Sequence, residues 1–236
     1  MKHKVHIYIN VAIINNVSDI LNNIVENIFN SGLYDFCDRI FLVVNGDLNK
    51  LDLNFLKPKF ELIVENDNVS KCEFPTISKI WKDCNNEEII VLYLHTKGVS
   101  RPNDEKIKDW VNLMIYFNII KWKERVNDLK NFDCSGVNLN GDKDDLNFSP
   151  DTWGVNKAPL HYSGNFWWSK SDHIKKLPNP YSWVPDDDYF KWRVMCEMWL
   201  CQIEESKYKC AWQSNVNHYH ELYPKTEYCI DERINF

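Results

Sequence analysis

The sequence predicts a single α/β domain in which helices cover both faces of a mostly parallel β-sheet. Four short apolar segments have the composition of buried strands: Lys4–Ile13, Arg39–Asn45, Phe60–Glu65 and Glu88–Leu94. Crossovers separate these segments, and crossover connections join strands that run parallel. The chain shows no internal repeat and no linker, so we expect one domain over residues 1–236.

Three segments are predicted to be helices. Asn16 is placed to cap an amphipathic helix that runs to about Phe29, and Pro75–Cys84 forms a second, short helix. Apolar residues recur at helical spacing throughout Asp104–Leu129, which predicts one long helix.

The last third of the chain is less regular. We expect strands at Asp133–Leu139 and Tyr208–Gln213, and a helix from the acidic run Asp186–Asp188 to about Gln202. A polar loop and the aromatic block His161–Trp168 come between the first of these strands and the helix. This part is therefore predicted to be an irregular C-terminal region attached to the sheet.

Composition and charge exclude several classes of protein. Against 28 Lys and Arg stand 34 Asp and Glu, a net charge of −6, whereas a nucleic-acid binder needs a basic face. The longest apolar run, Ile89–Leu94, is too short to span a bilayer, and the N-terminal segment lacks the apolar core of a signal peptide. We expect a soluble, cytoplasmic protein without a nucleic-acid partner, whose eight cysteines are reduced.

Several common motifs are absent from the sequence. With seven glycines, the chain has neither Gly-x-Gly-x-x-Gly nor a phosphate loop of the Gly-x4-Gly-Lys type. It also lacks the Gly-x-Ser-x-Gly elbow and the His-Glu-x-x-His zinc helix. Any nucleotide site must therefore be built from other residues.

The first candidate cluster, His95-Thr96-Lys97-Gly98, directly follows the most apolar strand. Open α/β sheets bind ligands at the carboxyl ends of their strands. Lys97 is suited to neutralise a phosphate, and His95 to ligate a metal or to donate to a diphosphate. The alternative is that both side chains merely line the end of the strand.

The second cluster spans Ser163 to Trp168. Gly164 permits close approach to the backbone, and Asn165 offers both a donor and an acceptor. Trp167 and Trp168 supply flat apolar surface, so the cluster has the groups that bind sugar hydroxyls and the apolar side of a sugar ring. Adjacent residues of a strand point to opposite faces, so we expect one indole in the core and one at the site.

The third candidate is Glu197, which lies among apolar residues of the C-terminal helix. Burial raises the pKa of a carboxyl group toward that of a useful general base, and Glu197 is predicted to have this role. A structural ion pair with Arg193, one turn earlier, is an equally good interpretation. Asp187 is the reserve candidate, although an acidic run at a helix start is typical of capping.

Two histidines near the C-terminus, His218 and His220, share one face if the backbone there is extended. One of them is then available to complete a metal or diphosphate site.

Five segments, in this order along the chain, resemble a group of small GT-A-type glycosyltransferases found in bacterial surface-polysaccharide clusters and in large DNA viruses. They are Glu73–Thr76 (EFPT), Tyr93–Gly98 (YLHTKG), His161–Trp168 (HYSGNFWW), Glu197–Trp199 (EMW) and His218–Glu221 (HYHE). The resemblance covers most of the chain, from about the first strand to Pro224.

The resemblance implies an α/β/α sandwich whose nucleotide-binding half covers about residues 1–100 and whose acceptor half covers about residues 101–236. It implies transfer of a sugar from a nucleoside diphosphate, with a UDP-sugar favoured, to a hydroxyl of a glycan or glycoprotein. One base, Glu197 or Asp187, is sufficient for an inverting reaction. The enzyme would act in the cytoplasm, which is that of the host if the protein is viral.

In GT-A enzymes the fourth strand usually ends in Asp-x-Asp, which holds Mn²⁺ or Mg²⁺ on the diphosphate. His95-Thr96-Lys97 takes that place here, so metal dependence stays open, and a lysine can supply part of the cation's electrostatic effect. If a metal binds, its candidate ligands are His95, His218 and His220. The nucleoside is expected near Asn10, Val11 and the turn that contains Asp67, and the diphosphate near Thr96 and Lys97.

Two functions from other classes remain open at this stage. A non-catalytic carbohydrate-binding module would use Trp167 and Trp168 as its platform. A sugar nucleotidyltransferase has a similar sheet but is disfavoured, because its glycine-rich loop is replaced by Asn10–Ile13.

Overall fold

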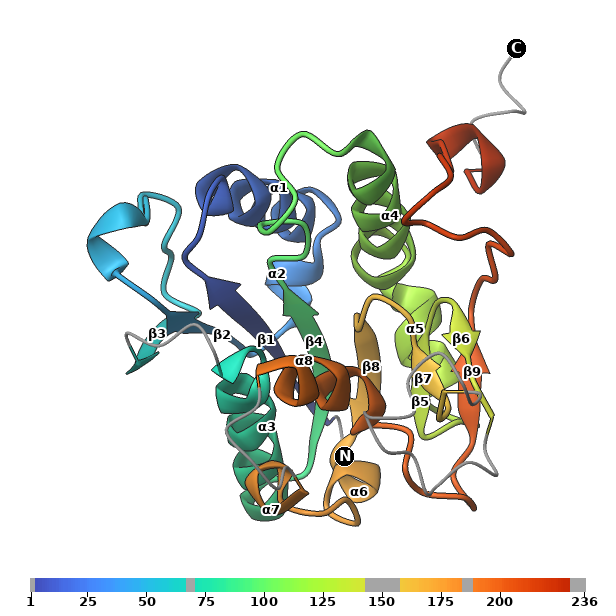
Figure 1. Cartoon of the computed structure of the whole chain (residues 1–236). Helices are drawn as coiled ribbons and strands as arrows, with labels where there is room; N and C mark the ends of the chain where they lie inside the picture. The colour runs from blue at the N-terminus through green and yellow to red at the C-terminus, as the bar shows by residue number, and fades with distance from the viewer. Residues whose placement is uncertain (1–2, 67–70, 143–157, 184–188, 230–236) are drawn as a thin grey trace.

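The computed structural model describes residues 3–66, 71–142, 158–183 and 189–229. Within these ranges the chain forms a seven-stranded sheet (Figure 1). In sheet order its strands are β3 (Phe60–Asn66), β2 (Arg39–Asn45), β1 (Lys4–Ala12), β4 (Ile89–His95), β8 (Trp167–Lys170), β5 (Cys134–Gly136) and β9 (Tyr208–Cys210). The first four strands run parallel, β8 is antiparallel to β4 and β5, and β9 is parallel to β5. The predicted fold class, a mostly parallel sheet with helices on both faces, is confirmed.

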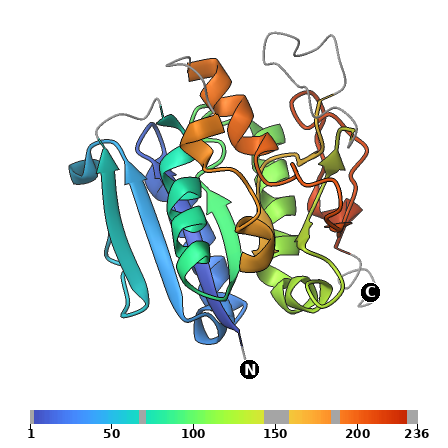
Figure 2. The same cartoon turned by 90° about the horizontal axis from the view of Figure 1, so that it is seen from below.

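Helices cover the two faces of the sheet because the strands alternate their apolar side chains between two cores (Figures 1 and 2). Ile7 and Ile9 of β1 pack into one core, and Tyr8 between them packs into the other. The first core is shared with α1 (Val17–Asn30), α2 (Leu33–Phe36), α4 (Glu105–Ile115) and α5 (Trp122–Asp128). The second is shared with α3 (Phe74–Asn86), α6 (Ser171–Ile174) and α8 (Tyr189–Met198), and α7 (Pro180–Trp183) lies against α3.

The single long helix predicted over Asp104–Leu129 is wrong. The segment consists of α4, a π-helical turn at Tyr116–Ile120, and α5. Lys121 N donates to Tyr116 O, five residues earlier, at 2.9 Å, which is the hydrogen bond of a π-helical turn. Within the same turn, the backbone carbonyl of Asn118 accepts a hydrogen bond from Trp168 Nε1 of β8 at 2.9 Å.

The strand predicted over Asp133–Leu139 is divided in two. β5 ends at Gly136, and Asn138 adopts a left-handed conformation with φ of 51° before β6 (Leu139–Asn140) begins. β6 pairs with β7 (His161–Tyr162) in a separate two-stranded sheet, so the chain leaves the main sheet at this point. Strand β9 is also shorter than expected, and the C-terminal region is irregular as predicted.

Three smaller expectations can be compared with the structure. Asn16 occupies the N-cap position of α1, but its side chain makes no capping hydrogen bond. All eight cysteines are free thiols, as expected. No helix in the described ranges has both the length and the apolar character needed to cross a membrane.

Candidate functional site

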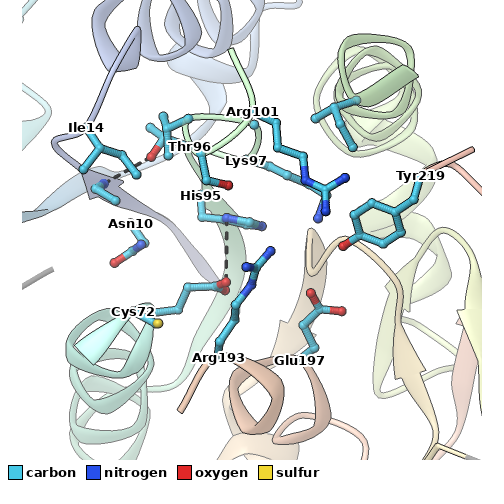
Figure 3. Close-up of a pocket in the computed structure, with 16 residues that line it drawn as sticks. Asn10, Ile14, Cys72, His95, Thr96, Lys97, Arg101, Arg193, Glu197 and Tyr219 are labelled. Atoms are coloured by element: carbon cyan, nitrogen blue, oxygen red, sulfur yellow. Dashed lines mark hydrogen bonds and ion pairs between the residues drawn. The ribbon is translucent and has the colours of Figure 1, made fainter. Parts of the chain in front are cut away.

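A pocket opens at the carboxyl ends of β1 and β4, where the sequence places the His95–Gly98 segment (Figure 3). Five parts of the chain form most of its walls: the end of β1, the end of β4, the loop from Thr96 to Arg101, the start of α3, and helix α8. Tyr219, in the C-terminal region, closes one side. We call it the cationic pocket, after the side chains of Lys97, Arg101 and Arg193 that line it.

The loop after β4 is fixed against β1. Thr96 N donates to Asn10 O at 3.0 Å, and Thr96 Oγ1 accepts from Ala12 N at 3.1 Å. Gly98 has a φ of 98°, a conformation that other residues rarely adopt, and it turns the chain back toward α4. Thr96 therefore serves mainly to hold the loop, and the loop in turn positions Lys97.

Three cationic side chains line the pocket. Lys97 is only 9% exposed, and its Nζ lies 3.9 Å from the ring centre of Trp110. The guanidinium of Arg101 lies over the ring of Tyr219, 4.7 Å from its centre. Figure 3 shows Arg193 reaching into the pocket from α8, opposite Arg101. Such a concentration of positive charge at strand ends is suited to bind a phosphate-bearing ligand.

Glu73 lies at the floor of this pocket, although it is not among the residues predicted for the site. Its Oε2 accepts hydrogen bonds from Tyr93 Oη at 2.5 Å and from Asn165 Nδ2 at 2.6 Å. His95 Nδ1 lies 3.7 Å from Glu73 Oε1. This buried carboxylate therefore joins the end of β4 to the segment before β8, and it is already occupied by protein donors. Glu73 belongs to the EFPT segment at the N-terminus of α3, and this segment was the feature of the sequence that could have indicated a role for it.

His95 is held on both sides. Its Nε2 donates to the backbone carbonyl of Gly164 at 2.9 Å, and its Nδ1 faces Glu73. Burial lowers the pKa of His95 below its usual value, the Glu73 carboxylate raises it in part, and Lys97 lowers it again. A neutral imidazole with its Nε2 committed to a carbonyl fits a positioning role better than the predicted role of metal ligand.

Glu197 extends from α8 into the same pocket. It is partly exposed, so the prediction of a carboxylate enclosed by apolar residues is wrong: its neighbours Cys196 and Met198 face the core, while Glu197 faces the opening. Arg193 and Glu197 are one turn apart, yet among the residues drawn in Figure 3 no ion pair joins them. Figure 3 shows the Glu197 carboxylate, the Tyr219 hydroxyl and the guanidinium of Arg101 pointing toward a common space. Arg101 and Tyr219 were missed by the sequence analysis, although both lie in or next to segments that it singled out.

The residues predicted to hold the nucleoside have different environments. Asn10 lines the pocket but its Oδ1 accepts from Asn45 Nδ2 and Thr76 Oγ1, each at 2.9 Å. The side chain of Val11 is completely buried in the core and cannot contact a ligand, so this prediction is wrong for its side chain. Asp67 and the reserve base Asp187 lie outside the described residues.

The predicted sugar platform is not formed. Trp167 and Trp168 do point to opposite faces of β8, but both are buried, one in each core. The reason is that β8 lies inside the sheet, between β4 and β5, where both faces are covered by helices. Asn165 is buried as well, and its amide binds Glu73 and accepts from Trp167 Nε1.

Gly164 and Ser163 remain from the same cluster. Gly164 is required by packing, because a Cβ at this position would collide with Met114 Sδ and lie against Trp110. Ser163 does not face the cationic pocket and instead lines a second pocket nearby.

The histidines predicted as metal ligands occupy separate environments. His218 is buried beside Trp110 with ring centres 5.0 Å apart, whereas His220 is exposed. They do not share a face, because the chain turns at this point instead of being extended. Among the residues that the structure describes, no group of three His, Cys, Asp or Glu side chains is placed to hold a metal ion.

Comparisons with known proteins add little to this geometry. No family model and no curated protein matches the sequence. Among solved structures, 4-diphosphocytidyl-2C-methyl-D-erythritol synthase from Anaerococcus prevotii is similar over 98% of both chains, with 10% sequence identity and a TM-score of 0.46. A likeness at this level does not assign the chain to a family or to an activity.

Proposed function

We propose that this protein is an inverting glycosyltransferase that uses a nucleoside diphosphate sugar, with a UDP-sugar favoured, and a hydroxyl of a glycan or glycoprotein as the acceptor. One observation carries the proposal: three cationic side chains and one partly exposed carboxylate line the same pocket at the carboxyl end of β4. The cations suit a diphosphate, and the carboxylate suits a hydroxyl that must lose its proton.

The diphosphate would lie between Lys97, Arg101 and Arg193. Lys97 and Arg101 lie over the rings of Trp110 and Tyr219, which leaves the charge of both side chains without a carboxylate partner among the described residues. When the bond between the sugar and the diphosphate breaks, negative charge grows on the departing diphosphate. Cations that are fixed in place before the reaction stabilise that charge without having to reorganise.

Glu197 is the base in this scheme. The acceptor oxygen forms a bond to the anomeric carbon while the bond from that carbon to the diphosphate oxygen breaks, and the hydroxyl proton passes to the Glu197 carboxylate. A single displacement of this kind inverts the configuration of the anomeric carbon. The partial exposure of Glu197 allows both substrates to reach it.

The described residues of the cationic pocket do not fit a divalent cation. The carboxylate on its floor, Glu73, is occupied by Tyr93 and Asn165, and the place of the expected Asp-x-Asp holds His95 and Lys97. The positive charge that a metal would bring is supplied here by side chains, and no step of the scheme depends on Mn²⁺ or Mg²⁺.

A melting-temperature screen tests the proposal. The protein is heated with UDP, GDP, dTDP and CDP, each with and without Mn²⁺, and then with the corresponding nucleosides. We expect one diphosphate to raise the melting temperature while its nucleoside does not, since a ligand that binds only the folded state stabilises it. Absence of a shift with every diphosphate would refute the proposal and would favour a carbohydrate-binding module. Release of pyrophosphate from a nucleoside triphosphate and a sugar phosphate would instead show a nucleotidyltransferase.

A further inference from the structure

A second pocket adjoins the cationic pocket on the C-terminal side of the molecule. It lies between β6, the turn after β7, the segment that follows β9, and α4. Most of the residues that line it carry an amide or hydroxyl group, among them Asn138, Asn140, Ser163, Gln213, Ser214 and Asn217. We call it the amide pocket.

The amide pocket carries no formal charge at neutral pH on the residues that the structure describes there. No Lys, Arg, Asp or Glu is among them. The titratable imidazole, His218, is neutral, because burial and the positive charge of Lys97 lower its pKa to about 4. A charged ligand would find no residue of opposite charge among the described residues that line this pocket, whereas a neutral ligand with many hydroxyl groups would find both donors and acceptors.

The amides at the rim hold one another in fixed orientations. Gln213 Nε2 donates to Asn140 Oδ1 at 2.9 Å, and Asn140 Nδ2 donates to Ser163 Oγ at 2.8 Å. Each amide nitrogen has two hydrogens and uses one of them in this relay. Among the described residues, the second N–H of each side chain has no hydrogen-bond partner, so it can bind a ligand, and both side chains are exposed.

Hydrogen bonds also fix the side chains on the inner wall of the amide pocket. Asn138 Oδ1 accepts from Ser214 Oγ at 3.0 Å and from Ser214 N at 2.9 Å, and Ser214 Oγ lies 2.8 Å from His218 Nε2. Asn138 and Asn215 both have positive φ, at 51° and 56°, in the left-handed region that asparagine adopts more readily than most residues.

Aromatic residues connect the two pockets. Tyr219 lines both of them, and its ring lies beneath Arg101 of the cationic pocket. Trp110 lines the amide pocket, stacks on His218 and carries Lys97 Nζ at 3.9 Å from its ring centre. A ligand in the amide pocket is therefore next to the groups that we expect to hold the diphosphate.

We propose that the amide pocket binds an uncharged saccharide, which is the acceptor of the transfer reaction. This inference rests on the proposed function. The donor sugar is bonded to the diphosphate and must stay in the cationic pocket beside Glu197, so the second substrate needs a separate, adjoining site. Planar amides for the hydroxyl groups and the Trp110 and Tyr219 rings for the apolar side of the sugar are the groups that such a ligand requires.

Saturation-transfer NMR with methyl glycosides tests this assignment. Methyl glycosides of glucose, galactose, mannose, rhamnose and N-acetylglucosamine are mixed in turn with the whole protein in the absence of nucleotide. At least one is expected to bind. Asn140→Ala and Gln213→Ala should each weaken its binding by about fivefold, the effect of one lost hydrogen bond. Gln213→Glu, which keeps the shape of the side chain but loses the donor to Asn140, should do the same.

The matched control is Asn86→Ala, which removes an exposed amide at the end of α3. It should change neither glycoside binding nor melting temperature, and melting curves of the other variants show whether they are folded. Three results would overturn the assignment: no binding of any methyl glycoside, binding that is unchanged in the Asn140 and Gln213 variants, or displacement of the glycoside by UDP alone. Binding of a glycoside together with failure to bind any nucleoside diphosphate would keep the pocket as a saccharide site and would refute the transferase function and the acceptor role.

Discussion

The cationic pocket and the amide pocket share Tyr219, yet they differ in charge and in the way the chain builds them. The first is built at the ends of parallel strands and on α8, and it holds Lys97, Arg101 and Arg193. The second is built mainly from short strands and turns of the C-terminal region, and its polar groups are amides and hydroxyls.

In the proposed function, this difference would separate the two tasks of a sugar transfer. Binding a diphosphate needs positive charge at a fixed place, which the rigid end of a sheet provides. Recognising one sugar among many needs several neutral donors and acceptors with fixed directions, and irregular segments can supply these one at a time. Tyr219 lines both pockets, and Trp110 lines the amide pocket and contacts Lys97. Substitution of either aromatic residue is therefore expected to affect ligand binding in both pockets.

The largest effect is expected at Glu197, which tests whether the cationic pocket is catalytic. Glu197→Gln keeps the size of the side chain but cannot accept the acceptor proton, so kcat should fall by about 100-fold or more. The affinity for UDP, measured by calorimetry, should stay within about twofold, because we propose that the cations and not Glu197 bind the diphosphate. Glu205→Gln, which alters an exposed carboxylate beyond α8, is the control and should have wild-type turnover. Wild-type turnover of a folded Glu197→Gln variant would exclude Glu197 as the base.

The next effect is expected at Lys97. Lys97→Met keeps a long side chain over Trp110 but removes the charge, so the affinity for UDP should fall by about tenfold or more, the effect of a lost charge-assisted hydrogen bond. The affinity for uridine and for the methyl glycoside should change little. Lys123→Met, on the exposed side of α5, is the matched control. Equal losses for UDP and uridine would show that Lys97 contacts the nucleoside or only supports the fold.

The parts of this molecule that follow from local pattern were predictable from the sequence. β2 has the predicted bounds, Arg39–Asn45, because its apolar run ends at a glycine. The location of the cationic pocket also followed, because the carboxyl end of a buried parallel strand is where such sheets bind ligands, and Lys97 lies there.

What could not be predicted depends on contacts between distant segments. The break in the long helix lies where Trp168 Nε1 donates a hydrogen bond to Asn118 O, and periodicity within the helix contains no sign of this contact. The burial of Trp167 beside Trp168 depends on the insertion of β8 between β4 and β5, a pairing that no local pattern shows. Glu73, Arg101 and Tyr219 form one site only after the chain has folded, and each of them taken alone is an ordinary residue.

Ligand binding in the two pockets should also depend differently on salt concentration, and this effect is expected to be smaller than that of the Lys97 substitution. Raising the ionic strength from about 0.1 M to about 1 M shortens the screening length from about 10 Å to about 3 Å. The dissociation constant for UDP is therefore expected to rise by about threefold, because Arg101 and Arg193 are exposed to solvent. The dissociation constant for the methyl glycoside should stay constant in the same titration. If salt weakened the binding of UDP and of the glycoside to a similar extent, glycoside binding would depend on charge, although no charged residue is found among the described residues that line the amide pocket.

The smallest effect concerns pH and the neutrality of the amide pocket. The pKa of His218 falls from its ordinary value of 6.5 to about 4 in the folded protein, owing first to burial and then to Lys97, with Glu221 opposing. Below pH 6.5 the unfolded chain therefore binds this proton more readily than the folded one, and the contribution of His218 to stability falls as the pH is lowered toward 4. His6, His95 and His173 also have lowered pKa values and act in the same direction. His218→Gln should reduce the fall in melting temperature between pH 7 and pH 4 by roughly 6 °C, without abolishing it. An identical pH dependence in wild type and variant would mean that His218 is protonated as easily in the folded protein as in the unfolded chain, and the amide pocket would then carry a positive charge in mild acid.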